Sequence, residues 1–373
     1  MLEWNNLSYW ESKIWKKKFD LIVVGSGITG ATAAIHFAKR NPGKRILVLD
    51  QFQFGLGATS KNAGFICFGS PSELLETKNN FGVDFLESQL RKKWHGHQIL
   101  LKTFGSSAIH AKMQGGSEVF QNKENAEYAL ENLQLLNQLF KKVSKVSDQF
   151  TSSASPFPLF YESSISIQVE GNLDSGSLLN QIRKKFSVNN IHFLGGLKVE
   201  NFERKSTGIH LQGNDFEFIS EKVLFATNGF ASEKPTVQPV LPGRGLVKVS
   251  SPLSYPFPNG TFHLDRGYTY FRKVDGNRLL IGGYRNLDKK SEETLEVGKN
   301  EVISSAIDQV TKENILGFLP EWDYSWNGWM GFTADENPII QKLDDGIVVA
   351  AGMNGMGVTL GPFAALEALR LFR

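Results

Sequence analysis

A glycine-rich hexapeptide, GSGITG at residues 25–30, lies between a continuous apolar run, FDLIVV, and a stretch of small apolar residues at helical spacing. A short apolar run closed by glycine predicts a buried parallel strand, and the stretch after the hexapeptide predicts a helix that stops at Asn41-Pro42-Gly43. A second apolar run, RILVLD, completes a βαβ unit. The chain is therefore expected to contain an α/β domain built on a parallel sheet.

The three glycines of this hexapeptide stand where a dinucleotide would require them. Gly25 permits a tight turn, Gly27 lets backbone N–H groups approach a pyrophosphate, and Gly30 allows the helix to pack closely on the strand. A bound anion would lie at the positive end of the helix. Asp50 ends the second strand, 20 residues after Gly30, and its carboxylate would bind ribose hydroxyls and repel a 2′-phosphate. The pattern favours FAD or NAD over NADP, with a glycine-rich turn that binds no ligand as the alternative.

A second cluster of small and polar residues, GATSKNAGF at residues 57–65, follows the second strand. An NAD site needs only the first cluster, whereas the isoalloxazine ring of FAD has to be held as well. Thr59 and Ser60 can donate to the pyrophosphate and the ribityl chain, and Asn62 offers a donor and an acceptor near the ring. Helix capping by Thr59 or Ser60 is the alternative use of this loop. The backbone could lie against the cofactor at the small residues Ala58, Ala63 and Gly64.

A third glycine cluster, GMNGMGVTL at residues 352–360, stands between the apolar run GIVVAA and a C-terminal helix. The N-terminal N–H groups of that helix would point outwards. Aimed at the N1–C2=O edge of a flavin, they would stabilise the negative charge that develops there on reduction. The return to strand–glycine–helix order suggests that one nucleotide-binding domain is assembled from separated segments.

These segments together resemble the D-amino-acid-oxidase-like (DAO) superfamily of FAD-dependent oxidoreductases, which includes glycine oxidase, sarcosine oxidase and γ-glutamylputrescine oxidase. SYWE and ATNGF are similar to the γ-glutamylputrescine-oxidase-like branch. The matching stretches cover nearly the whole chain in the family's order: DLIVVGSGITGATAAIHFA, LGATSKNAGF, VLFATNGF, PGRGLVKVSSPL, NRLLIGGY, WMGFTADENPII and GIVVAAGMNGMGVTLGP.

The resemblance implies a set of FAD-binding residues, most of them in the three glycine clusters, with others at the end of the second strand, in the W-x-G segment near residue 330 and at two positions on the adenine side. Val199 would meet the adenine through its backbone, and Thr227 ends the strand that closes that side. The set is Gly25, Ser26, Gly27, Ile28, Thr29, Gly30, Asp50, Gln51, Ala58, Thr59, Ser60, Asn62, Ala63, Gly64, Val199, Thr227, Gly331, Met353, Asn354, Gly355, Met356, Gly357, Val358 and Thr359.

Three departures from the family's pattern bear on function. Several relatives hold the substrate carboxylate with an Arg two residues after the Gly of a W-x-G segment, where this chain has Thr333. Sarcosine oxidases have a Lys in the C-terminal glycine loop, where this chain has Thr359, and attach the flavin to a Cys, where this chain has Met330. The single cysteine, Cys67, is far from that motif in sequence. FAD is therefore expected to bind non-covalently, and a simple amino-acid substrate would lack its usual carboxylate contacts.

The expected fold class is α/β (α+β overall), with a Rossmann-like FAD-binding domain and a second, antiparallel-sheet substrate domain interleaved in sequence. The FAD-binding domain is assigned to residues 19–75, 166–233 and 326–373, the substrate domain to 76–165 and 234–325, and residues 1–18, with Trp4, Trp10 and Trp15, to an N-terminal arm packed on the body. Apolar periodicity predicts helices at 71–80, 83–104, 124–147, 173–186 and 299–315, and β-rich segments at 157–168 and 236–285.

The resemblance implies oxidation of a C–N bond in an amine or amino-acid-like substrate, by hydride transfer to the flavin N5 and hydrolysis of the resulting imine. Arg272 is the preferred contact for an acidic group on the substrate, and no catalytic residue can be assigned. For the candidate substrate contacts, the alternative is ordinary packing of aromatic side chains in a β-sheet domain. The His95/His97 pair has no metal-binding spacing and is expected on a helix surface. The candidate substrate contacts are Tyr268, Tyr270, Arg272, Trp329 and Thr333.

Composition narrows the alternatives. The net charge of +3 gives no basic field for nucleic acid, which argues against an RNA-modifying relative. A single cysteine, no signal-peptide pattern and no long apolar run point to a cytoplasmic protein without membrane insertion. Two other readings stay open. One is a flavin dehydrogenase with an acceptor other than O2, since the Lys that assists oxygen in sarcosine oxidases matches near Leu280; the other is a non-catalytic FAD-containing assembly protein.

Overall fold

The computed structural model describes residues 6–53, 55, 57–233 and 239–372, so Trp4 and residues 234–238 lie outside the described part. Its first sheet has the predicted βαβ unit at the centre: β1, α2 (Ile28–Arg40) and β2, with β1 parallel to both β2 and β11. β8 and β18 continue the parallel pairing outwards. The strands, in spatial order, are β17 (Ile339–Asp344), β18 (Ile347–Ala351), β11 (Phe216–Phe225), β1 (Phe19–Val24), β2 (Ile46–Asp50) and β8 (Ile191–Gly195), with β10 (Gly208–Gly213) and β9 (Asn201–Lys205) attached to β11.

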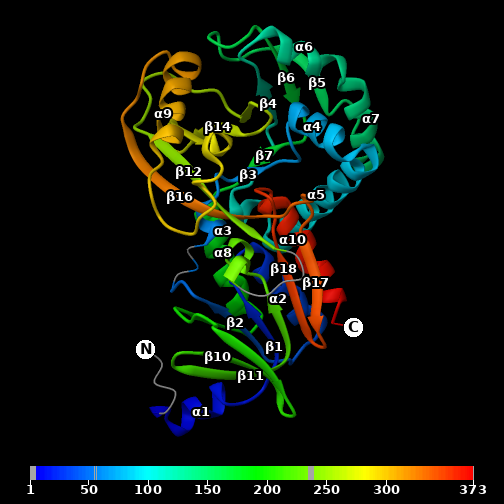
Figure 1. Cartoon of the computed structure of the whole chain (residues 1–373), viewed down its shortest axis with the longest axis vertical. Coiled ribbons are helices and arrows are strands. Elements are labelled where there is room, and N and C mark those ends of the chain that lie inside the picture. Colours follow the sequence, from blue (N-terminus) through cyan, green and yellow to red (C-terminus); the bar gives the residue numbers. More distant parts are fainter. Residues whose placement is uncertain (1–5, 54, 56, 234–238, 373) are drawn as a thin grey trace.

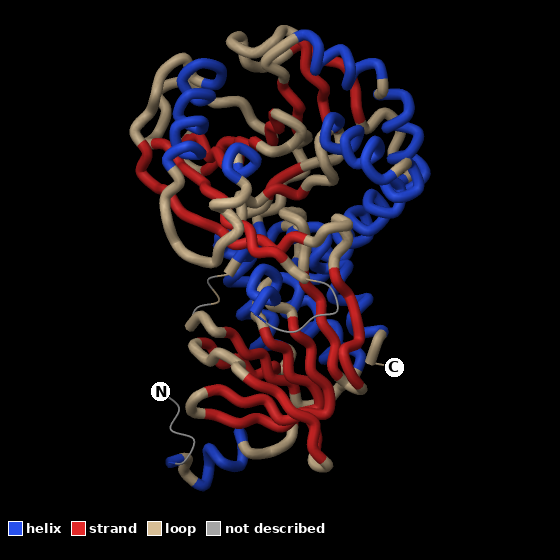
Figure 2. Tube along the Cα trace, viewed as in Figure 1, coloured by secondary structure: helices blue, strands red, loops and turns tan. Residues whose placement is uncertain are grey.

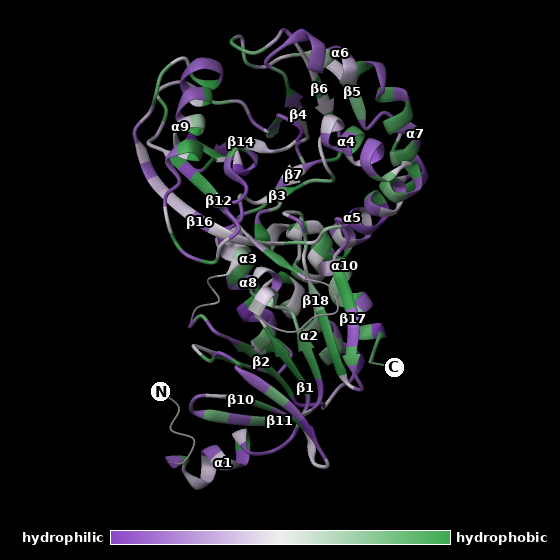
Figure 3. Ribbon diagram, in the orientation of Figure 1, coloured by the Kyte–Doolittle hydropathy of each residue, from purple (hydrophilic) through white to green (hydrophobic). Residues whose placement is uncertain are grey.

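This sheet is buried because both of its faces are covered. α2, α8 (Ser175–Val188) and α10 (Gly357–Arg370) pack on one face, and the β9–β10–β11 meander contributes to the cluster on the other. All five residues of β2 and all five of β18 are consequently buried, as expected for parallel strands. Figure 3 shows the hydrophobic residues concentrated along β1, β2 and β18.

The second sheet is mainly antiparallel and forms the other half of the molecule. A cluster of phenylalanines, including Phe157, Phe262 and Phe271, packs under it with α9 (Glu301–Val310). Its strands, in spatial order, are β16 (Trp322–Phe332), β12 (Leu241–Ser250), β15 (Arg278–Gly283), β14 (Thr269–Val274), β13 (Thr261–Leu264), β4 (Gly116–Val119), β6 (Ser163–Ile167) and β5 (Phe150–Ala154). A short pair, β3 (Phe65–Ile66) and β7 (Gly171–Asn172), completes the strands of the described part.

Helices cover the outer side of β4, β5 and β6, where Figure 2 shows them gathered at the upper right. α4 starts with a capping box between Ser70 and Glu73 and with Pro71 in its first turn. The single helix predicted at 124–147 is wrong, since Asn132 ends α6 and its side chain donates to the carbonyl oxygen of Tyr128 (2.8 Å). The helices that cover these strands are α4 (Pro71–Phe81), α5 (Val83–Phe104), α6 (Lys123–Glu131) and α7 (Leu133–Ser144). A further, short helix is α3 (Ala58–Lys61).

The two sheets lie one above the other along the long axis of the molecule, with α3, α8 and the N-terminal end of α10 between them (Figure 1). The chain passes from one half to the other several times, which fits the predicted interleaving. The predicted boundaries at 166 and 326 both cut strands, since β6 and β16 lie whole in the second sheet. The predicted β-rich segment at 157–168 forms a strand from Ser163 to Ile167, and the predicted helix at 299–315 continues after α9 as a π-helical turn, η5 (Thr311–Ile315).

The N-terminal helix α1 (Tyr9–Trp15) lies at the free end of the first sheet. Trp15 packs edge-on against Phe218, whereas Trp10 is 71% exposed, so the predicted packing of the arm holds for Trp15 and is wrong for Trp10. No helix in the described ranges combines the length and the apolarity that crossing a bilayer requires.

Candidate functional site

A cavity of about 860 Å³ lies between the two sheets, and all three glycine clusters line it. The first sheet contributes the ends of β1 and β2 and the start of α2. The second sheet contributes residues of β12, β14 and β16, and the turn after β15. The two 3₁₀ segments η3 (Asn228–Glu233) and η4 (Arg285–Asp288) also border it. One elongated ligand could therefore touch segments that are more than 300 residues apart in the chain.

The first glycine cluster forms the open N-terminus of α2. Gly25 has φ +107°, and a Cβ there would collide with the carbonyl oxygen of Ala226, directly after the neighbouring strand β11. A Cβ at Gly30 would collide with the carbonyl of Gly25, which confirms its predicted packing role. Gly27 caps the helix without a side chain. The helix N-terminus is thus left facing the cavity, where an anion is favoured.

Asp50 stands beside this helix terminus with its carboxylate already oriented by the chain. Ser26 donates to Asp50 Oδ2 through its N–H (2.8 Å) and its hydroxyl (2.6 Å), and the N–H of Phe52 donates to Oδ1 (2.9 Å). Ser26 itself does not line the cavity, so it positions Asp50 rather than facing a ligand. The carboxylate borders the cavity together with Val199, as the predicted ribose and adenine positions require.

The second cluster uses its polar groups partly within the chain. Thr59 Oγ1 accepts the N–H of Ile28 (2.8 Å), which joins this loop to the start of α2 and leaves the hydroxyl hydrogen free to donate. The Asn62 amide donates to the carbonyl oxygen of Thr59 (2.5 Å) and accepts from Gly64 N–H (2.7 Å) and the Ser175 hydroxyl (2.9 Å). Asn62 therefore builds the turn, instead of offering a free donor and acceptor as predicted.

The third cluster is fixed to β16 by Asn354. Its N–H donates to the carbonyl oxygen of Gly331 (2.9 Å), and its side-chain oxygen accepts the N–H of Thr333 (2.9 Å). Thr359 Oγ1 donates to the carbonyl oxygen of Cys67 (3.3 Å), which ties this loop to the chain directly after β3, two residues beyond the second cluster. These contacts hold the N-terminus of α10 at the cavity wall, where Gly357 and Val358 line the cavity.

Most of the predicted cofactor residues line this one cavity. Ser26, Gly30, Ser60, Gly64 and Gly331 stand behind the wall. Those that line it are Gly25, Gly27, Ile28, Thr29, Asp50, Gln51, Ala58, Thr59, Asn62, Ala63, Val199, Thr227, Met353, Asn354, Gly355, Met356, Gly357, Val358 and Thr359.

The family of FAD-dependent oxidoreductases known as DAO matches residues 20–371 of the chain. The chain belongs to this family. Its cofactor is FAD. The three glycine clusters, the oriented Asp50 carboxylate and the N-termini of α2 and α10 at the cavity wall fit a flavin dinucleotide.

Individual relatives of this FAD-dependent oxidoreductase are distant. The chain is 24% identical to gamma-glutamylputrescine oxidoreductase of Escherichia coli (strain K12), over 95% of this chain and 83% of the relative. It is 22% identical to a probable oxidoreductase, OrdL, of Rhizobium meliloti (strain 1021), over 93% and 81%. In fold it is similar to L-proline dehydrogenase from P. horikoshii, with TM-score 0.75 and 18% identity over 95% of this chain and 93% of the other.

Four of the five predicted substrate contacts of this oxidoreductase line the cavity: Tyr268, Tyr270, Trp329 and Thr333. Burial raises the pKa of Tyr270 to about 12, so its phenol stays protonated. The indole N–H of Trp329 is buried and has no acceptor among the described residues, which makes it available to a ligand.

Arg272, the fifth, lies outside the cavity wall. Its guanidinium donates to the carbonyl oxygens of Ala63 (2.7 Å) and Leu173 (3.1 Å). Burial lowers its pKa to about 10. The side chain thus holds the second glycine cluster against the second sheet. The hypothesis that it binds an acidic group of the substrate does not fit this position.

Arg285 is a cavity residue that the sequence analysis missed. Its Nε and Nη2 are buried without a hydrogen-bond partner in the described part of the chain, and its guanidinium lies 4.1 Å from the centre of the Phe332 ring. An unpaired buried guanidinium is costly unless a ligand supplies an acceptor. The only local signal was a lone Arg directly after the strand NRLLIGGY.

The prediction that His95 and His97 both lie on a helix surface is wrong for His97. It is 7% exposed and packs edge-on against Phe68, and neither ring nitrogen has a partner among the described residues. Burial lowers its pKa to about 4, so the ring is neutral at pH 7. His97 does not line the cavity.

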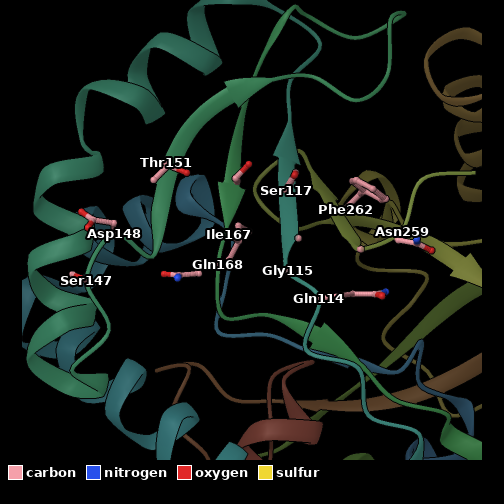
Figure 4. A pocket seen from close by; sticks show the side chains of 13 residues that line it. Gln114, Gly115, Ser117, Ser147, Asp148, Thr151, Ile167, Gln168, Asn259 and Phe262 are labelled. Atoms are coloured by element: carbon pink, nitrogen blue, oxygen red, sulfur yellow. The ribbon is translucent and has the colours of Figure 1, made fainter.

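A second, polar pocket of about 640 Å³ lies over β4, β5 and β6, away from the glycine clusters (Figure 4). The residues that line it are Gln114, Gly115, Gly116, Ser117, Ser147, Asp148, Thr151, Ser166, Ile167, Gln168, Asn259, Gly260 and Phe262, none of which is a predicted site residue.

Proposed function

We propose that this chain oxidises a C–N bond of an amine or amino-acid-like substrate, with FAD lying along the three glycine clusters. One observation supports this most strongly: the cavity continues from the glycine clusters to a wall of the second sheet that carries Tyr268, Tyr270 and Trp329. When bound, FAD would supply the acceptor for a hydride from the carbon next to the substrate nitrogen. The chain positions that carbon and excludes water. The names of two relatives, a gamma-glutamylputrescine oxidoreductase and an L-proline dehydrogenase, agree with a nitrogen-containing substrate.

The proposal includes non-covalent binding of FAD. Cys67 borders the cavity, but burial raises the pKa of its thiol well above the ordinary value, and Glu170 and Glu73 raise it further. A protonated thiol is a poor nucleophile for a flavin link. Whether O2 or another acceptor reoxidises the flavin, and whether the protein is cytoplasmic, stay predictions. So does the division into an FAD-binding domain around the first sheet and a substrate domain around the second.

Arg285 is the proposed contact for an acidic group on the substrate, in place of Arg272. Burial lowers the pKa of Arg285, while the charges of Glu293 and Glu292 raise it. Glu292 is engaged elsewhere, since it accepts two hydrogen bonds from Arg244 (2.9 and 2.7 Å). A substrate carboxylate could therefore pair with the Arg285 guanidinium.

The test is the visible spectrum of the purified protein, followed without oxygen while amines and amino acids are added. We expect a flavin spectrum that one of these compounds bleaches. Alcohols and 2-hydroxy acids of the same carbon skeleton serve as controls and should leave the spectrum unchanged. Bleaching by the alcohols alone would refute C–N oxidation, and a flavin that no amine reduces would favour the assembly-protein alternative. Readmitted air then distinguishes an oxidase from a dehydrogenase.

A further inference from the structure

A buried histidine–glutamate pair stands in the wall of the cavity. His263 Nε2 lies 2.5 Å from Glu170 Oε1, and the hydroxyl of Thr261 donates to the same carboxylate oxygen (2.6 Å). His263 is 3% exposed and Glu170 is fully buried. The two residues are 93 positions apart in the chain, and the sequence analysis assigned neither of them.

The fold encloses the carboxylate on all sides. Glu170 directly precedes β7, and a Cβ at Gly116 would lie 3.2 Å from its carboxyl carbon, so the absence of a side chain there makes room for it. Its other oxygen has no partner among the described residues. A buried carboxylate of this kind is stabilised chiefly by a proton on the neighbouring imidazole.

The imidazole, in contrast, borders the cavity. His263 is a lining residue, and its second ring nitrogen, Nδ1, has no hydrogen bond to any described residue. The Phe65 ring meets it edge-on at 5.5 Å, and Tyr270 is its cross-strand neighbour on β14. Both neighbours line the cavity where the second glycine cluster approaches the second sheet.

Several charged groups face this imidazole. Glu118 is its register neighbour on β4, and Glu73 lies on α4, 3.8 Å from the Lys93 ammonium. Burial lowers the pKa of His263, but the charges of Glu170, Glu73 and Glu118 and the hydrogen bond to Glu170 together raise it above its ordinary value. Burial also raises the pKa of Glu118 to about 7, so its charge is partial near neutral pH. The surroundings therefore strengthen the imidazole as a base.

We propose that Glu170 and His263 form a proton-accepting pair that deprotonates the substrate ammonium, a step that rests on the proposed function. The N–H bond of the ammonium breaks and its electron pair stays on the substrate nitrogen. A new N–H bond forms at His263 Nδ1, and Glu170 holds the resulting imidazolium through the proton on Nε2. His263 acts on the substrate, and Glu170 is a positioning residue.

Such a step would speed the reaction because an alkylammonium with a pKa of about 10.4 is almost wholly protonated at pH 7. Only the neutral amine has the lone pair that assists departure of a hydride from the adjacent carbon. A base at the cavity wall supplies that form of the substrate without waiting for the rare neutral amine from solution.

The pair is tested by the pH dependence of anaerobic flavin bleaching in the wild type, E170Q and H263N. We expect the wild-type rate to fall as the pH drops through the titration of His263. In E170Q that fall should move to lower pH by about one unit or more, because the imidazole is a weaker base. For the same reason, the rate at high pH should be lower than in the wild type by at most about 10²-fold. In H263N the fall at the titration of His263 should be absent. The bleaching rate should instead increase with pH until the pH reaches the pKa of the free substrate amine.

Glu217 provides a matched control, since Glu217 Oε1 lies 2.7 Å from His210 Nδ1 in a similar pair that does not border the cavity. E217Q should leave the pH profile unchanged. Should E170Q fail to fold, E170D, which withdraws the carboxylate from the ring, takes its place. An acid limb at the same pH in the wild type, E170Q and H263N, with FAD still bound, would overturn the proposal.

A second readout does not depend on turnover. A nitrogen-15 NMR titration of the FAD-loaded protein without substrate should show the His263 ring with a pKa above the ordinary value for histidine. The His263 signal is identified by its absence in H263N. In E170Q the pKa of His263 should be lower. An equal titration in both would also refute the pair. If no amine bleaches the wild type although this coupling is present, it is the proposed function that fails.

Discussion

At the scale of single residues, the cavity owes its character to a few side chains that the rest of the chain leaves unsatisfied. Arg285 and Trp329 each present buried nitrogen atoms without an acceptor in the described ranges. Arg272, by comparison, donates to backbone carbonyl groups from each of its three guanidinium nitrogens. A guanidinium that the protein does not neutralise is the better candidate for binding an anion.

R285Q is expected to weaken the binding of an acidic substrate, since a hydrogen bond to a charged group contributes about 1.5–3 kcal/mol. The substrate concentration at half-maximal flavin reduction should therefore rise about 10- to 100-fold. Rapid anaerobic mixing would measure it, with the limiting rate at saturation unchanged. Amines without an acidic group should be unaffected.

Arg266 offers the control for that measurement. It also borders the cavity, but it already pairs with Glu76 at 3.2 Å. R266Q should change the half-reducing concentration little. Equal losses in R266Q and R285Q would mean that general charge, rather than a specific contact, attracts the substrate.

At the scale of elements, the cofactor loops depend on how closely two helices cross. Gly96 of α5 meets the backbone of α10, and a Cβ at this position would collide with the carbonyl oxygen of Thr359. Thr359 also donates to the carbonyl oxygen of Cys67. The crossing therefore sets the position of the α10 N-terminus against the segment that directly follows the second glycine cluster.

Gly96 to Ala should lower the free energy of unfolding by about 1–3 kcal/mol, because the helices must move apart. In an exposed helix the same change would be stabilising by about 1 kcal/mol, so the sign is diagnostic. Urea unfolding would measure it, and FAD affinity should fall with it. S88A, at an exposed position of the same helix, is the control and should be nearly neutral. A stabilised G96A protein would show that the contact yields without cost.

At the scale of the whole molecule, the FAD cavity joins segments from the beginning, middle and end of the chain. Asp50 and Val199 border one part of it, and Tyr270 and Met356 border another. A ligand that spans these parts binds only the folded chain, so it should stabilise the two sheets together.

Saturation with FAD at about 100 times its Kd should add about 2.7 kcal/mol to the free energy of unfolding. Thermal melts of the cofactor-free protein with added FAD would report this as a rise in Tm. FMN lacks the adenosine half that Asp50 and Val199 are positioned to meet, so it should give a clearly smaller rise at equal concentration. Equal rises in Tm with FMN and FAD would contradict the prediction that the cavity binds FAD along its full length.

The local parts of this architecture were predictable from the sequence. The βαβ unit, the glycine positions and the second, antiparallel sheet follow from short-range patterns, because apolar periodicity and glycine conformation act over a few residues. The break of one predicted helix at Asn132 was not foreseen, since a single polar residue can either continue or end a helix.

The sequence by itself therefore determined the family, the cofactor and the three segments that surround it. The tertiary structure decided which side chains face the cavity. It turned Arg272 and Asn62 into supports, buried His97, and brought Glu170 to His263 across 93 residues. Such contacts depend on how distant strands and helices pack, and a pairing across that separation leaves no periodic pattern in the chain.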